Sequence, residues 1–209
     1  MVELRDRIKT QFAVVYLTLI SVIQASVLGY LFTQADPLLP KLNMRSGLLL
    51  VVSFSTLALV WNEYVMWTSM VRWVPRLPDA FLPLLMGVFQ FGMARSITAK
   101  SPAYFFSLAA FLVVAWAKLR HASVVARREP ENAAVLATLG AWIPITEWLV
   151  VVGAAIALLA AWLDVRFDAW QGTWPWAAAL VAVIPGAYIA RTVVYWRLVC
   201  PVEPDSPSV

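Results

Sequence analysis

The sequence contains few charged residues for its length. Only 13% of its 209 residues are Asp, Glu, Lys or Arg, whereas 62% are hydrophobic, and the mean hydropathy is +0.76. An ordinary soluble domain is about 25% charged, and no polar stretch in this chain is long enough to form one. We therefore expect a single membrane domain over residues 1–200, followed by a disordered, proline-rich tail over residues 201–209.

The residue types that build most catalytic and metal sites are also scarce. The single cysteine, Cys200, excludes an internal disulfide, and the single histidine, His121, argues against a His-rich metal or haem site. The chain has no Gly-x-Ser-x-Gly motif, no His-Glu-x-x-His motif and no Gly-rich phosphate loop. Its basic residues are spread over several segments and form no nucleic-acid-binding patch. We therefore expect no catalytic activity, no cofactor or metal and no nucleic-acid partner.

The most prominent feature of the sequence is a set of six apolar segments. About 20 apolar residues suffice to cross a bilayer. The first is too long for a signal-peptide core, so we expect it to be an uncleaved span. The third and fourth are short, but Ser101-Pro102 between them is typical of a helix start, which favours two helices. The sequence predicts an all-α bundle of six transmembrane helices, over about residues 12–32, 48–72, 81–97, 103–117, 141–163 and 174–196.

The placement of Lys and Arg predicts the orientation of this bundle. If the N-terminus is cytoplasmic, ten basic residues in the loops and at the span ends lie on the cytoplasmic side and five on the opposite side. That bias fits the positive-inside rule with both termini cytoplasmic. The longest cytoplasmic loop begins with a basic run, Lys118–Arg128, which we interpret as a topology signal that contacts anionic headgroups.

Three ionisable residues inside the predicted spans, Glu63, Glu147 and Arg191, are the main candidates for function. Such residues are costly in a membrane and by default are read as functional. At about 1.5 Å per helical residue, Glu63 lies roughly 22 Å and Arg191 roughly 25 Å below the outer ends of their spans. By the same rise, Glu147 lies roughly 9 Å above the inner end of its own span. All three fall in the cytoplasmic half, so we expect them to form one cluster.

Polar neighbours extend this cluster. Asn62 precedes Glu63, and Tyr188 lies one turn before Arg191, just after a Pro185-Gly186 pair that we expect to break its helix. Gln24 and Gln90 we interpret as helix contacts. A buried Glu–Arg pair can be purely structural, so a structural and a functional role for Glu63 and Arg191 both stay open.

The layout of six spans in about two hundred residues, with both ends inside, resembles that of the small bacterial potassium channels related to the lysosomal one. That family is marked by an Arg-x-x-x-Phe-Ser-Asp motif at the start of its first helix. Here the corresponding stretch reads RDRIKTQFAVVY, with Phe12 but no following Ser-Asp. The resemblance is therefore one of layout, and we assign no family from it.

Two functions from different classes remain. The first is a small permeation protein in membrane lipid, a homo-oligomeric channel or carrier of the bacterial inner membrane. Its path for a small cation or proton would pass the residues of the predicted cluster, namely Glu63, Asn62, Glu147, Arg191 and Tyr188. The second is a non-transporting membrane subunit that docks a partner through its polar helix faces and its basic loop. The lack of a soluble domain favours the first, and the lack of a Gly-rich filter loop or internal repeat favours the second.

Overall fold

The computed structural model describes residues 2–98, 102–167 and 174–199. Within these ranges the chain is helical, contains no strand and has short connections. The predicted disordered tail lies outside the described residues. The elements in chain order are α1 (Val2–Ala35), η1 (Asp36–Lys41), α2 (Met44–Met70), α3 (Leu77–Ser96), α4 (Ala103–Ala126), η2 (Pro130–Asn132), α5 (Ala133–Leu139), α6 (Trp142–Phe167) and α7 (Trp174–Val199).

Six of these helices are long and apolar enough to cross a membrane, which confirms the number of spans predicted from the sequence. The third and fourth are longer than predicted. α3 has 20 residues and α4 has 24, so they extend about 30 Å and 36 Å. α3 begins four residues earlier than expected because Asp79 caps its first turn, where Oδ2 accepts a hydrogen bond from the Arg76 backbone N–H at 2.7 Å. α4 continues past Ala117 and ends at Ala126.

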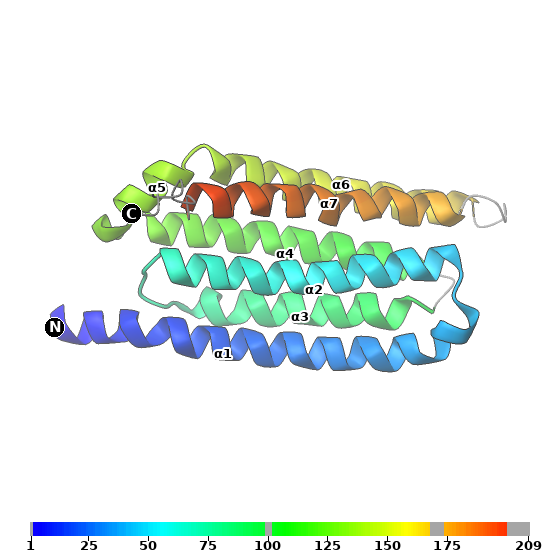
Figure 1. The fold of residues 1–209 in the computed structure, drawn as a ribbon, viewed down its shortest axis with the longest axis horizontal. Helices are drawn as coiled ribbons and strands as arrows, with labels where there is room; N and C mark the ends of the chain where they lie inside the picture. Colours follow the sequence, from blue (N-terminus) through cyan, green and yellow to red (C-terminus); the bar gives the residue numbers. More distant parts are fainter. Residues whose placement is uncertain (1, 99–101, 168–173, 200–209) are drawn as a thin grey trace, which may run out of the picture.

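The helices run back and forth along one axis, with the N-terminus and the end of α7 at the same end of the bundle (Figure 1). Their packing contacts join α1 to α3, α3 to α4, α4 to α6, α6 to α7, α7 to α2 and α2 back to α1. This order differs from the chain order because α2 returns to pack on both α1 and α7. The six helices therefore form a closed ring whose interior is lined by α2, α3, α4, α6 and α7.

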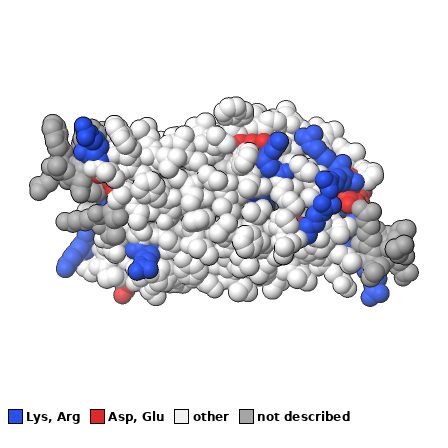
Figure 2. All heavy atoms as spheres, turned by 180° about the vertical axis from the view of Figure 1, so that it is seen from behind, with Lys and Arg blue, Asp and Glu red and all other residues white. Residues whose placement is uncertain are grey.

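Polarity is inverted relative to a soluble protein. Large apolar side chains such as Val14, Phe54 and Trp148 are exposed on the outside, whereas ionisable side chains are buried between helices. In Figure 2 the charged side chains of one face gather toward the two ends, with a zone of uncharged atoms between them. An apolar outer belt with polar groups turned inward is the arrangement expected of a helical bundle in a bilayer.

Side-chain hydrogen bonds and ion pairs tie the helices together at the end that holds the termini. The Asn132 side chain accepts a hydrogen bond from the Arg72 N–H at 2.9 Å. It donates to the carbonyls of Arg72 at 2.7 Å and Ala126 at 3.0 Å. On α1, Lys9 forms ion pairs with Glu129, at 2.8 Å, and with Glu131. The α4–α5 connection is therefore anchored to both α1 and the α2–α3 loop.

The predicted break at Pro185-Gly186 is wrong. α7 is a continuous α-helix from Trp174 to Val199, with Pro185 inside it. Proline removes one backbone donor, but within a membrane bundle neighbouring helices can compensate for the lost bond. No described residue has a positive φ angle.

Candidate functional site

An ion pair between α2 and α7 lies at the centre of the bundle. The Arg191 guanidinium donates to both carboxylate oxygens of Glu63, from Nη1 to Oε2 at 2.6 Å and from Nη2 to Oε1 at 3.4 Å. Both residues are buried, with 6% of Glu63 and 3% of Arg191 exposed. The contact predicted from their matched depths is thus confirmed. A bidentate Arg–carboxylate pair is the strongest neutralising contact that a buried carboxylate can make.

Neighbouring side chains satisfy the rest of this pair. Trp67 donates from Nε1 to Glu63 Oε1 at 2.7 Å, and Arg191 donates from Nε to Thr146 Oγ1 at 2.9 Å. The guanidinium carbon also lies 3.7 Å from the ring centroid of Tyr195 and 5.1 Å from that of Tyr188. Such stacking stabilises a buried cation. The charge of Arg191 is therefore fully compensated inside the protein.

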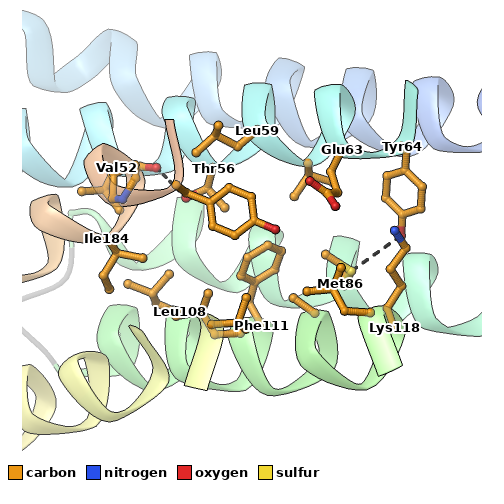
Figure 3. A pocket seen from close by; sticks show the side chains of 17 residues that line it. Val52, Thr56, Leu59, Glu63, Tyr64, Met86, Leu108, Phe111, Lys118 and Ile184 are labelled. Atoms are coloured by element: carbon orange, nitrogen blue, oxygen red, sulfur yellow. Dashed lines mark hydrogen bonds between the residues drawn. The ribbon is translucent and has the colours of Figure 1, made fainter. Parts of the chain in front are cut away.

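A second buried cation, Lys118 on α4, is not compensated in this way. Only 7% of Lys118 is exposed, and its Nζ makes no hydrogen bond to any residue that the structure describes. Its nearest support is aromatic, because Nζ lies 4.3 Å from the centroid of the Tyr64 ring and 6.0 Å from that of Trp67. In Figure 3 Lys118 reaches from α4 toward Tyr64 on α2. A buried amine without an acceptor is costly, so its presence here needs an explanation.

Lys118 and Glu63 line the same cavity. A cavity of about 70 Å³ lies between α2, α3, α4, α6 and α7, and its polar lining groups come from Thr56, Glu63, Tyr64, Lys118 and Tyr188. The remaining wall is aliphatic or aromatic, with Leu108 and Phe111 of α4 facing Thr56 of α2 (Figure 3). A volume of this size has room for about two to four water molecules or one small ion. The cavity brings a carboxylate, an amine and two phenols together.

Lys118 also connects this cavity to a smaller pocket nearer the bundle end that holds the termini. That pocket, of about 10 Å³, is lined by Asp79 of α3 and His121 of α4 together with Lys118 and Trp67. Asp79 Oδ1 lies 3.3 Å from His121 Nε2. Protonatable side chains therefore follow one another from this bundle end to the central cavity: Asp79 and His121, then Lys118, then Glu63.

Glu147 does not join the cluster that Glu63 and Arg191 form, so the prediction that both glutamates share one site is wrong for Glu147. Its carboxylate lies 3.3 Å from Arg120 of α4, whose side chain is 59% exposed. The reason is helical direction. Thr146, the preceding residue, contacts Arg191, and one residue turns an α-helix by about 100°. Matched depth alone therefore placed Glu147 on the wrong side of α6.

The other predicted site residues divide between the cavity and the helix contacts. Tyr188 lines the cavity. The Asn62 side chain instead accepts a hydrogen bond from Trp196 Nε1 at 3.2 Å and so joins α2 to α7. Gln24 and Gln90 bond to each other between α1 and α3, at 3.0 and 3.4 Å. These polar faces thus pair with one another inside the chain, as expected for helix contacts.

Lys118 is the main residue that sequence reasoning missed, because it was taken as the start of a basic cytoplasmic loop. A signal for it does exist in the sequence. Leu108, Phe111, Ala115 and Lys118 recur at helical spacing, and all four line the central cavity. Extending that stripe past Ala117 would have placed Lys118 on the inward face of α4. Asp79 was also missed, because it lies before the predicted start of its span.

Comparison with protein-family models, curated proteins and solved structures finds no match for this chain. The candidate site therefore rests on its own geometry.

Proposed function

We propose that the chain is an integral membrane protein with both termini in the cytoplasm, and that it carries protons across the membrane through the central cavity. The apolar exterior and the ten-to-five bias of basic residues support this insertion. The observation that carries the transport proposal is the placement of Glu63, Lys118 and Tyr188 around one buried cavity. Chains of protonatable side chains within a membrane mark proton paths.

The residues between the cytoplasmic end of the bundle and the cavity support proton entry from the cytoplasm. Asp79 and His121 share a pocket with Lys118, and Lys118 in turn lines the cavity with Glu63. A proton entering from the cytoplasmic end therefore finds a titratable group at each step.

The charge balance narrows the sequence-based proposal of a cation path to protons. The described wall of the cavity contributes one carboxylate, Glu63, which is already neutralised by Arg191. Lys118 adds a cationic side chain to the same wall. A metal cation would thus meet repulsion without a free carboxylate to offset it. A proton needs no such coordination, since it moves between the groups themselves.

Beyond the cavity the outer half of the bundle is closed by packing between α2 and α4. The Tyr104 hydroxyl lies 2.9 Å from Ser53 Oγ and donates to the Leu49 carbonyl at 3.1 Å, and Tyr104 is fully buried. Passage to the outer side requires this contact to separate. We therefore favour a carrier or gated path over an always-open channel.

Proton flux in liposomes tests the proposal. Purified protein in vesicles with a pH-sensitive dye should dissipate an imposed pH gradient faster than empty liposomes, with valinomycin and equal potassium on both sides holding the membrane potential at zero. Lys118→Met and Glu63→Gln should each reduce the rate at least tenfold. Arg127→Gln, an exposed basic residue at the end of the same helix as Lys118, should leave it unchanged. Flux at the level of empty liposomes, with a membrane partner co-purifying at fixed stoichiometry, would support the subunit hypothesis instead.

Cysteine labelling tests the orientation. In a Cys200→Ser background, Asp36→Cys should react with an impermeant maleimide added outside intact cells, whereas Arg128→Cys should react only after lysis. Both positions are exposed and lie in connections at opposite ends of the bundle. Labelling of Arg128→Cys from outside would reverse the proposed topology. Homo-oligomerisation stays a prediction from the sequence.

A further inference from the structure

The central cavity holds a positive group that has no hydrogen-bond partner among the described residues. Lys118 is more than nine-tenths buried, and no described residue accepts a hydrogen bond from its Nζ. Asp79, the carboxylate that shares its smaller pocket, is occupied by the Arg76 N–H and lies against His121. Aromatic rings of Tyr64 and Trp67 stabilise the ammonium but accept no conventional hydrogen bond. The ammonium therefore lines the cavity with N–H donors that no described residue accepts.

The charges around the cavity leave a positive surplus. Glu63 is the carboxylate among its lining residues, and it already receives two hydrogen bonds from Arg191 and one from Trp67. That leaves the Lys118 ammonium as the charge on this wall without a hydrogen-bonded counterion among the described residues, with the Asp79 carboxylate in the adjoining smaller pocket. The apolar remainder of the wall lowers the local dielectric, which strengthens the attraction of Lys118 for any anion that enters.

We infer that the cavity binds one small monovalent anion against Lys118 Nζ. Its volume of about 70 Å³ fits a halide, nitrate or formate and excludes bulky anions such as gluconate. The Tyr188 and Thr56 hydroxyls on the wall are already engaged, because Tyr188 hydrogen-bonds Glu63 and Thr56 donates to the Val52 carbonyl at 2.7 Å. Lys118 Nζ is therefore the donor that the anion would meet. The mostly apolar wall favours anions that lose their hydration shell at low cost.

This inference rests on the proposed function, because it places the anion in the cavity of the proposed proton path. The anion would then cross together with the proton. An anion at Lys118 cancels the surplus charge. A proton and an anion could then cross together as an electrically neutral pair, which avoids moving net charge through the apolar outer half. Transport should then depend on the anion supplied.

Calorimetric titration of the purified protein in nanodiscs tests binding separately from transport. In a gluconate buffer, nitrate and formate should each bind saturably to the wild-type protein. Lys118→Met should weaken binding at least tenfold, whereas the matched control Arg127→Gln should leave it unchanged. Lys118→Met removes an unpaired buried amine and should fold at least as well as wild type, so loss of binding cannot be attributed to unfolding. Absence of saturable binding by wild type, or equal binding by Lys118→Met, would overturn the inference.

The two proposals fail in different ways. Anion binding that requires Lys118, together with no proton flux, would support the anion site and remove the transport function. Proton flux that is the same in gluconate as in nitrate, with no anion binding, would retain the transport function and remove the anion site. Flux that rises at least threefold when nitrate replaces gluconate, in wild type but not in Lys118→Met, would support both.

Discussion

Arg191 and Lys118 are two buried basic residues of the same bundle with opposite surroundings. Arg191 has a carboxylate, a hydroxyl and two aromatic rings as partners. Lys118 has aromatic rings but no described hydrogen-bond acceptor. Both are buried, and Arg191 pairs with Glu63, which lines the same cavity as Lys118, so burial alone does not explain the difference. The contrast separates a cation that holds helices together from one that remains available for a ligand or a proton.

The comparison also changes how Glu63 is interpreted. A carboxylate that is bidentate with an arginine is largely satisfied and has a clear structural role. In the proposed proton path, Glu63 would act by giving up part of that pairing. Lys118, by contrast, needs no rearrangement before it can bind. The unpaired residue is therefore the better marker of function, although the paired residue is the one that the sequence makes conspicuous.

The largest effect is expected from breaking the paired site. Glu63→Gln should lower the free energy of unfolding by about 3–5 kcal/mol, because it leaves Arg191 buried without a counter-charge. The double variant with Arg191→Met should lose less than Glu63→Gln alone, since no lone charge then remains. Unfolding of the four proteins of this cycle in detergent measures the coupling. Additive losses would show that the pair contributes no coupling energy.

A smaller effect of opposite sign is expected at the unpaired site. Lys118→Met should raise the free energy of unfolding by about 1 kcal/mol, because the gain from removing an unsatisfied buried amine exceeds the lost contact with Tyr64. The melting temperature in detergent checks this, with Arg127→Gln as an exposed control on the same helix. A Lys118→Met protein less stable than wild type would mean that the ammonium is structural, and that Arg191 and Lys118 do not differ in kind.

Much of the fold could be predicted because hydrophobic length and charge bias are properties of contiguous sequence. Six apolar runs gave six helices, and rise per residue placed Glu63 and Arg191 at one level, where they form an ion pair. The ends were less accurate. The start of α3 depended on a cap formed by Asp79 with Arg76, and the end of α4 depended on contacts with Asn132, which no hydropathy window contains.

The site was predicted only in part because depth gives no direction around a helix. Glu147 has the right depth and faces Arg120, while Thr146 beside it faces Arg191. Lys118 has the right direction but was assigned to a loop by its charge. Pro185 was expected to break α7, yet the helix is continuous because the surrounding bundle supports it. In each case the deciding contact comes from another helix.

The smallest effect is expected at Glu147, and it sharpens the comparison with Glu63. Both residues are glutamates of helices that are long and apolar enough to cross a membrane, and both pair with an arginine. The partner of Glu147 is Arg120, whose side chain is mostly exposed, so solvent screens the pair and Arg120 can turn into water when the partner is lost. Glu147→Gln should therefore lower the free energy of unfolding by less than about 1 kcal/mol. It should also leave proton flux and nitrate binding unchanged, because no described contact joins Glu147 to the cavity.

Unfolding, flux and calorimetry on Glu147→Gln and Glu63→Gln side by side measure the difference. Equal losses in the two variants would mean that Glu147 belongs to the same functional unit as Glu63, and that the path through the bundle runs along α6 as well as between α2 and α4.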